Sequence, residues 1–111
     1  MFSIDENKNI YTIKGDTAHF KMAISPYEVQ EGDVLTFTVR KRYGGPVVIT
    51  TNADEDGVFH IAHEDYEDVT PGYYIYDIQL TTEQGEVYTV IGPAHIAIDI
   101  EVTTEVAPDA E

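Results

Sequence analysis

No cysteine and no tryptophan occur among the 111 residues of the chain. The absence of cysteine excludes disulfide bonds and thiolate zinc sites, so the fold has to be held together by a hydrophobic core. Hydrophobic residues make up 42% of the sequence, and a chain of this length buries about 65% of the surface of its unfolded state. We therefore expect one folded domain at residues 1–104, followed by an acidic flexible tail at residues 105–111.

Basic residues are scarce. Six Lys and Arg residues stand against 21 Asp and Glu residues, which gives a net charge of −15. Nucleic acids and anionic membranes repel such a chain, so neither is expected as a partner. No apolar run approaches the roughly 18 residues of a membrane span, and the N-terminus lacks the regions of a signal peptide. We expect a protein that stays where it is made or joins an assembly.

No window of helical length carries a sustained period of 3.6 residues, whereas alternation with period 2 recurs along the chain. Leu35, Phe37 and Val39, for example, alternate with polar residues. This alternation, interrupted by glycine-containing turns, predicts an all-β fold, an antiparallel β-sandwich with Greek-key character and about seven to eight strands. The strands are expected at residues 10–14, 17–24, 34–42, 46–51, 57–63, 72–82, 85–91 and 94–104.

The stretch EDYEDVTPGYYIYDIQL is the most specific structural signal. A strand is followed by an acidic loop, then by Pro71-Gly72, and then by tyrosines that begin a long alternating strand. This is the context of a tyrosine corner, in which a phenol hydroxyl bonds to the backbone a few residues upstream. We assign that structural role to Tyr74. The alternative is that Tyr74 is only a core aromatic residue.

The stretch NADEDG resembles the start of a calcium-binding loop. Asn52, Asp54, Asp56 and Gly57 fit the first half of that motif. The position of its bidentate glutamate, however, holds His63, the flanking runs look like strands rather than helices, and Asp-Gly is a hairpin signal in its own right. We expect a hairpin tip and no bound metal, and a calcium-stabilised β module is the alternative.

The remaining polar residues do not indicate an enzyme. His60 and His63 are expected on opposite faces of one strand, and His19 and His95 lie on distant strands that could meet across a sheet. A metal site built from them is less common than histidines on a solvent-exposed face. The chain has no cysteine nucleophile, no G-x-S-x-G motif and no phosphate-binding loop. We expect neither catalysis nor a cofactor.

Two neighbouring strands carry apolar residues on both faces. Tyr73 and Ile75 lie on the second face of one strand, and Tyr88 and Val90 lie on the second face of the next. If the strands pair as antiparallel neighbours, these four residues form one patch on a face that is usually polar. Such a patch is covered either by loops of the same chain or by another subunit.

Tyrosine-rich faces also suit sugar stacking. Tyr43, Tyr73 and Tyr88 are the candidates for a carbohydrate-binding surface. Tryptophan, the commonest stacking platform, is absent, and no secretion signal is present. We therefore keep a ligand-binding β-sandwich of the carbohydrate type as an alternative to a structural protein.

The order of the motifs resembles the N-terminal domain of phage baseplate upper proteins and related virion fibre proteins. The matching pieces span about residues 10–103: Gly15-Asp16-Thr17, the L-T-F-T-V strand at 35–39, G-x-Y-x-Y-D-I-x-L at 72–80 and G-P-x-x-I-x-I at 92–98. The resemblance implies an Ig-like sandwich in a phage or prophage, which joins other virion proteins or copies of itself in a symmetric part such as the baseplate, tail or fibre, often as a trimer. It implies no catalysis and no cofactor.

The same resemblance implies a location in the cytoplasm of a host bacterium during assembly and in the virion afterwards. In one respect this chain departs from the pattern, because such domains usually precede a longer receptor-binding module, whereas here the sequence ends a few residues after the last expected strand. A stand-alone structural or accessory role is therefore expected.

Overall fold

The computed structural model describes residues 2–24 and 27–100, and these contain eight strands, one 3-10 helix and no α-helix. The elements are β1 (Ser3–Ile4), β2 (Ile10–Ile13), β3 (Ala18–Phe20), β4 (Val34–Arg40), β5 (Val47–Asn52), β6 (Phe59–Ile61), η1 (His63–Tyr66), β7 (Gly72–Thr81) and β8 (Val87–Asp99). The expected tail at 105–111 and the end of the expected strand 94–104 lie outside the described residues. Within these residues no helix is long and apolar enough to cross a membrane.

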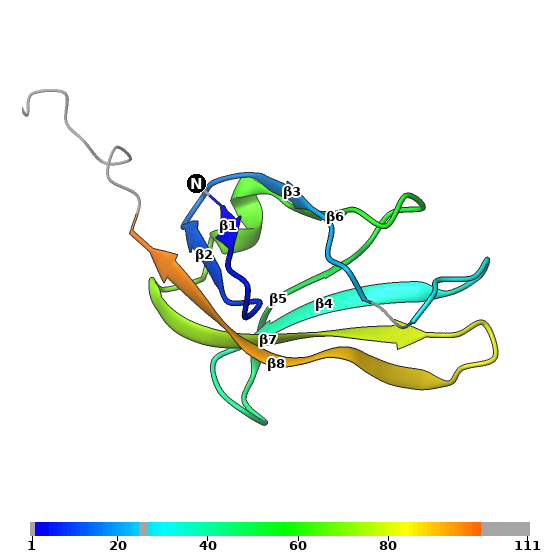
Figure 1. Ribbon diagram of the computed structural model, residues 1–111. Coiled ribbons are helices and arrows are strands. Elements are labelled where there is room, and N and C mark those ends of the chain that lie inside the picture. The colour runs from blue at the N-terminus through cyan, green and yellow to red at the C-terminus, as the bar shows by residue number, and fades with distance from the viewer. Residues whose placement is uncertain (1, 25–26, 101–111) are drawn as a thin grey trace, which may run out of the picture.

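The strands form two layers. A six-stranded sheet in the order β1-β2-β8-β7-β4-β5 packs against the two-stranded sheet β3-β6 (Figure 1). The run β8-β7-β4-β5 corresponds to the G-F-C-C′ strands of a variable-type Ig domain, with β3 and β6 in the places of strands B and E. The prediction of an Ig-like β-sandwich is confirmed.

One strand pair departs from the antiparallel arrangement that the sequence predicted. β2 lies parallel to β8, with Ile10 opposite Ile96 and Ile13 opposite Asp99. After β2 the chain turns at Gly15, whose φ of 93° suits glycine, and crosses to β3 in the other sheet. Because β3 lies in the other sheet, β2 pairs on that side with β8, which is far away in the sequence.

The predicted boundary at Gly92-Pro93 was wrong. The two strands expected at 85–91 and 94–104 are one continuous strand, β8. Proline is tolerated in a strand where the ladder of hydrogen bonds is interrupted. The register between β7 and β8 shifts twice here, once between Tyr76 and Ile78 of β7 and again between Ile78 and Gln79. The break in the alternation at Gly92-Pro93, which we interpreted as a turn between two strands, is a bulge within β8.

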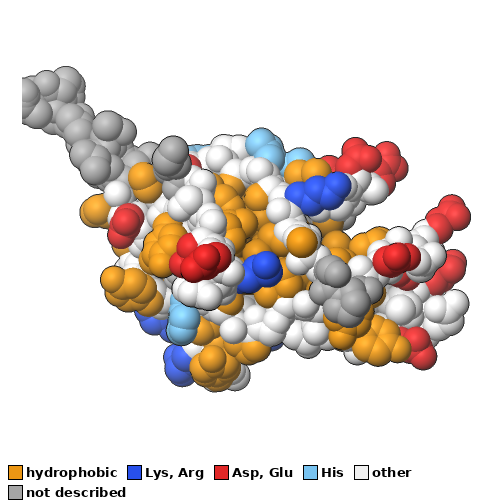
Figure 2. Space-filling view, in the orientation of Figure 1, with side chains coloured by type: hydrophobic (Ala, Val, Ile, Leu, Met, Phe, Trp, Pro, Cys, Tyr) orange, Lys and Arg blue, Asp and Glu red, His pale blue; other side chains and the backbone are white. Residues whose placement is uncertain are grey.

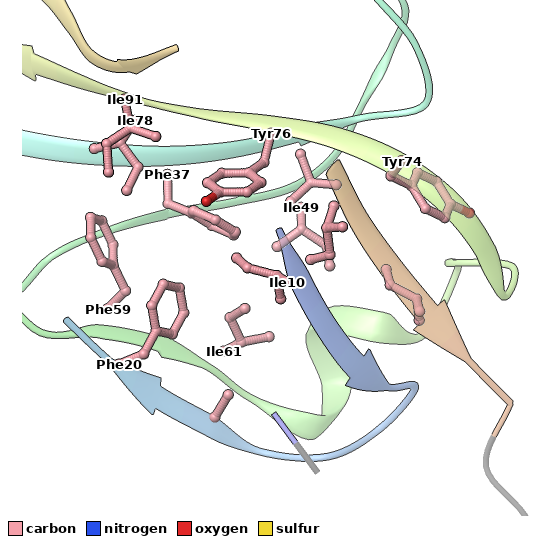
Figure 3. Close-up of a cluster of buried hydrophobic side chains, with 14 of the residues drawn as sticks. Ile10, Phe20, Phe37, Ile49, Phe59, Ile61, Tyr74, Tyr76, Ile78 and Ile91 are labelled. Carbon is pink, nitrogen blue, oxygen red and sulfur yellow. The ribbon is translucent and has the colours of Figure 1, made fainter. Parts of the chain in front are cut away.

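Aromatic rings from both sheets form the centre of the core (Figure 3). Phe37 and Tyr76 come from the large sheet, and Phe20 and Phe59 come from the small one. The Phe37 ring lies 5.2 Å from that of Phe20, 5.8 Å from that of Phe59 and 5.1 Å from that of Tyr76, measured between ring centroids. At the other end of the core, η1 contributes the buried ring of Tyr66.

Tyr76 links this core to the β1–β2 loop. Its side chain is 2% exposed, and its hydroxyl donates a hydrogen bond to the carbonyl oxygen of Lys8 at 2.5 Å. Burial, with a smaller contribution from the negative charge of Asp5, raises the pKa of Tyr76 from 10.0 to about 12. The folded state thus keeps this proton at pH values where the unfolded chain has lost it.

We expect the stability that Tyr76 provides to be complete below pH 10 and to be lost as the pH rises from 10 towards about 12. The Tyr76→Phe variant loses the hydrogen bond, which costs about 1 kcal/mol near pH 8, and its stability falls less steeply above pH 10. Urea unfolding from pH 8 to 12 measures both effects. Parallel pH profiles for the two proteins would show that this account of Tyr76 is incorrect.

Candidate functional site

Tyr74 lies near the start of β7, in the place of strand F, and is 3% exposed. Its hydroxyl donates a hydrogen bond to the carbonyl oxygen of Thr70, four residues upstream. This is the contact that defines a tyrosine corner. The ammonium nitrogen of Lys41 lies 4.7 Å from the centroid of the ring. Tyr74 therefore joins the loop before β7 to the core.

The histidines are arranged differently from what the sequence predicted. His19 meets His60 across the β3–β6 pair, with their Nδ1 atoms 2.6 Å apart, whereas His95 lies on β8. The Nε2 atom of His60 is 2.8 Å from the carboxylate of Asp54, so in the neutral ring it carries the proton and Nδ1 accepts from His19. His63 begins η1 instead of ending a strand.

The NADEDG stretch forms a tight turn around Asp54. The carboxylate accepts the backbone N–H groups of Asp56 and Val58 at 2.9 and 3.0 Å, and Gly57 adopts a φ of 81°. The expectation of a simple hairpin was wrong, because β5 pairs with β4 whereas β6 pairs with β3, so this turn connects the two sheets. Asp-Gly indicates a tight turn whether that turn joins two paired strands or two strands of different sheets.

The candidate calcium ligands of this turn do not converge. The hydrogen bond from His60, followed by those from the backbone of Val58 and Asp56, holds the pKa of the Asp54 carboxyl below its usual value. The side-chain oxygen of Asn52 instead accepts a hydrogen bond from Thr36 at 2.8 Å. In the part of the chain that the structure describes, no group of three or more acidic or histidine side chains is placed to hold a metal ion.

The four apolar residues expected in one patch lie in two places. Tyr73 is on the outer face of the large sheet and is 81% exposed, and Ile75 follows it on the same face. Tyr88 is opposite the buried Leu80 and so points to the core side, about 23 Å further along β7. Val90 packs partly buried against the core. The antiparallel pairing places Tyr88 opposite Leu80, far from Tyr73, and the register shift between Ile78 and Gln79 turns Tyr88 to the core side.

Tyr11 takes the place on the outer face that the sequence assigned to Tyr88. It lies on β2 opposite Ala97, which in turn lies opposite Tyr73, so the three residues form a row across β2, β8 and β7. The side chain of Tyr11 is 48% exposed. This row was not predicted from the sequence, because it depends on the parallel pairing of β2 with β8.

The turn between β4 and β5 extends this exposed surface. Tyr43, at its tip, is 69% exposed and lines a hollow of about 130 Å³ together with Ile75. We call the surface made by Tyr11, Tyr43, Tyr73 and Ile75 the aromatic end. Because Tyr88 is not part of it, the three tyrosines considered for sugar stacking do not form one platform.

Half of the basic residues of the chain gather at one turn, although acidic residues such as Asp5, which accepts a hydrogen bond from Tyr11, also lie at the aromatic end. Arg40, Lys41 and Arg42 are half of the six Lys and Arg residues of the chain, and they adjoin Tyr43. Acidic side chains gather at the opposite end, on the right in Figure 2. The molecule is therefore acidic overall but has a basic region beside its aromatic end.

A cleft of about 510 Å³ opens at the acidic end (Figure 2). Its apolar lining comes from both layers of the sandwich and from the segments before β4 and after β5: Met22, Ile24, Val29, Leu35 and Ala53. Five acidic residues border it: Glu31, Asp33, Asp54, Glu55 and Asp56. We call this feature the acid-rimmed cleft. It lies at the beginning of β4, whereas the basic turn lies at the end of the same strand.

No protein-family model and no curated protein matches the chain. Among solved structures, it is similar to CopC from Methylosinus trichosporium OB3b, with 10% sequence identity, a TM-score of 0.46 and coverage of 84% of this chain and 85% of that one. It is also similar to the first Ig-like domain of human CD48 antigen, with 11% identity, a TM-score of 0.39 and coverage of 89% and 87%. These likenesses concern the fold and assign no ligand or partner to the chain.

Proposed function

We propose that the protein is a non-enzymatic structural subunit of a phage or prophage, which assembles with copies of itself in a symmetric virion part such as the baseplate, tail or fibre. Its place is then the cytoplasm of the host bacterium during assembly and the virion afterwards. The virion assignment rests on the order of sequence motifs. The assembly role rests on the aromatic end.

The aromatic end supports this role because the outer face of a β-sandwich is normally polar. Here Tyr73 is 81% exposed beside the partly exposed Ile75, with Tyr11 in the same row as Tyr73. Tyrosine and arginine are the residues most enriched at the centres of protein interfaces, and Arg40 lies opposite Ile75 in the sheet. A second protein surface that covers this end removes its apolar area from water.

The high negative charge fits an assembling subunit. A net charge of −15 keeps free copies soluble through mutual repulsion. Association then has to be directed by a local surface with a different charge, and the basic residues beside the aromatic end provide one.

The test is a double variant, Tyr73→Glu with Ile75→Lys, which changes the outer face without changing the net charge. We expect it to weaken self-association at least about 30-fold, since truncation of interface hot spots costs about 2 kcal/mol or more. Light scattering on a sizing column, over a range of protein concentrations, measures the mass. The expected result is the mass of one chain at concentrations where the unaltered protein is assembled.

The matched control is Gln79→Lys with Thr89→Glu. These two residues are cross-strand partners on the same face of β7 and β8, away from the aromatic end. The control is expected to keep the mass of the unaltered protein. Equal masses for the test variant and the unaltered protein would exclude the aromatic end as the contact surface.

A further inference from the structure

We propose that the acid-rimmed cleft receives the basic β4–β5 turn of a second copy of the chain, with Tyr43 entering the cleft and Lys41 and Arg42 meeting its acidic rim. This inference rests on the proposed function and deepens it, because it names the surface that the aromatic end contacts. The contact is then head to tail.

The β4–β5 turn is built to project its tip. The backbone N–H of Gly45 donates to the carbonyl oxygen of Arg42 at 2.8 Å, and the guanidinium of Arg40 donates to the carbonyl oxygen of Gly45 at 2.7 Å. Gly44 has a φ of 69°, which a side chain at that position would strain. The tip is therefore held in shape while Tyr43 at its end stays 69% exposed. A preorganised tip loses little conformational entropy on binding.

The acid-rimmed cleft has the size and lining for such a tip. Its volume of about 510 Å³ falls within the range of about 300–1,000 Å³ in which proteins bind drug-sized groups. Leu35 on one side, and Met22 and Ile24 on the other, offer apolar contact to an aromatic ring. Met22, Ile24 and Ala53 are only partly buried in the single chain, so filling the cleft with Tyr43 removes apolar surface from solvent on both partners.

The charges of the two surfaces are complementary. Lys21 is the only basic residue that lines the cleft among those the structure describes, against five acidic ones. The turn presents Lys41 and Arg42, both exposed, next to Tyr43. Opposite potentials favour the encounter of these surfaces and disfavour cleft-to-cleft contact. Because the Debye length is about 8 Å at physiological salt, high salt is expected to weaken the contact.

One chain cannot make this contact with itself. The cleft adjoins Leu35 at the start of β4, and the turn begins after Arg40 at its end, about 17 Å away along an extended strand. The tip must therefore enter the cleft of another copy. Such a contact uses two different surfaces, and it forms a closed ring if the rotation between copies closes and a filament if it does not.

The experiment uses two variants that each disable one surface. The tip variant carries Arg42→Glu and Tyr43→Ser, and the cleft variant carries Glu31→Lys and Glu55→Lys. All four positions are exposed in turns, and circular dichroism confirms that each variant is folded. We expect each variant alone to have the mass of one chain under conditions where the unaltered protein is assembled.

The mass of a mixture of the two variants tests the head-to-tail contact most directly. The tip variant retains an intact cleft, and the cleft variant retains an intact tip, so the mixture is expected to form pairs and to stop at the mass of two chains. A third variant, Glu64→Lys with Glu67→Lys, makes the same change in net charge as the cleft variant at exposed positions in and next to η1. It is expected to assemble like the unaltered protein.

Two results would overturn the head-to-tail contact. One is a cleft variant that assembles normally while the Tyr73→Glu, Ile75→Lys variant does not, which would leave the proposed function standing with a different opposing surface. The other is a mixture that stays at the mass of one chain. An unaltered protein with the mass of one chain at every concentration would remove both the contact and the proposed self-assembly.

Discussion

Replacing Phe37 by alanine is expected to lower the free energy of unfolding by about 3–5 kcal/mol, the range for truncating a buried phenylalanine. The side chain is fully buried, with 0% exposure. Its ring contacts three other aromatic rings, those of Phe20 and Phe59 in the small sheet and that of Tyr76 in its own sheet. The substitution therefore opens a cavity at the point where the two sheets meet.

Such a loss is a large part of the total stability of a small domain, which is about 5–15 kcal/mol. Urea unfolding followed by circular dichroism measures it. Phe2 is a suitable comparison, because its ring stacks on Phe20 at 4.6 Å but is only partly buried at the margin of the core. The Phe2→Ala variant is expected to lose clearly less. If both variants lost the same small amount, Phe37 would not be the centre of the core.

The Tyr74→Phe substitution removes a single hydroxyl group and is expected to cost about 1–3 kcal/mol of stability. The ring is buried, so its packing is kept, while the carbonyl oxygen of Thr70 loses its partner in the corner. The loop before β7 is then no longer tied to the strand. The melting temperature is expected to fall by several degrees in a domain of this size.

The adjacent tyrosine provides the control. Tyr73→Phe makes the same chemical change one residue away, on a side chain that is 81% exposed. Its effect is expected to lie within about 0.5 kcal/mol, as for most surface substitutions. Both variants are compared by thermal unfolding at one protein concentration. A Tyr74→Phe variant as stable as Tyr73→Phe would show that the corner hydrogen bond contributes nothing.

The features that the sequence predicted correctly are local ones. Alternation placed Leu35, Phe37 and Val39 on the buried face of β4. The role of Tyr74 followed from a short stretch in which an acidic loop, Pro-Gly and a strand succeed one another, and the two atoms that bond are four residues apart. Patterns of this length record burial and turn geometry, and both are set by neighbouring residues.

The features that the sequence did not predict depend on residues far apart in the chain. The partner of His19 is His60 rather than His95, because β3 pairs with β6 outside the large sheet. Tyr88 turned out to face the core side, because the register shifts between β7 and β8 move the faces relative to each other. A single extra residue in one strand reverses which face a side chain occupies, and alternation alone does not reveal it.

In the candidate site too, the features set by neighbouring residues were predicted and those set by residues far apart in the chain were not. Tyr73 and Ile75 were expected on the second face of one strand, and they lie on the outer face of the large sheet, where Tyr73 is exposed and Ile75 is partly buried. Tyr11 belongs to the aromatic end only because β2 pairs in parallel with β8. The acid-rimmed cleft was not predicted, because it forms where segments before β4, after β3 and after β5 come together.

The proposed function requires that the chain assembles with copies of itself through the aromatic end. The most direct test is the absolute mass of the unaltered protein, measured by light scattering over a dilution series at physiological and high salt, with and without EDTA. We expect a mass of several chains at high concentration, which falls with dilution and with added salt and does not respond to EDTA. The mass of one chain under every condition would exclude self-assembly, and a mass that changed with EDTA would point instead to a metal ion at residues 52–57.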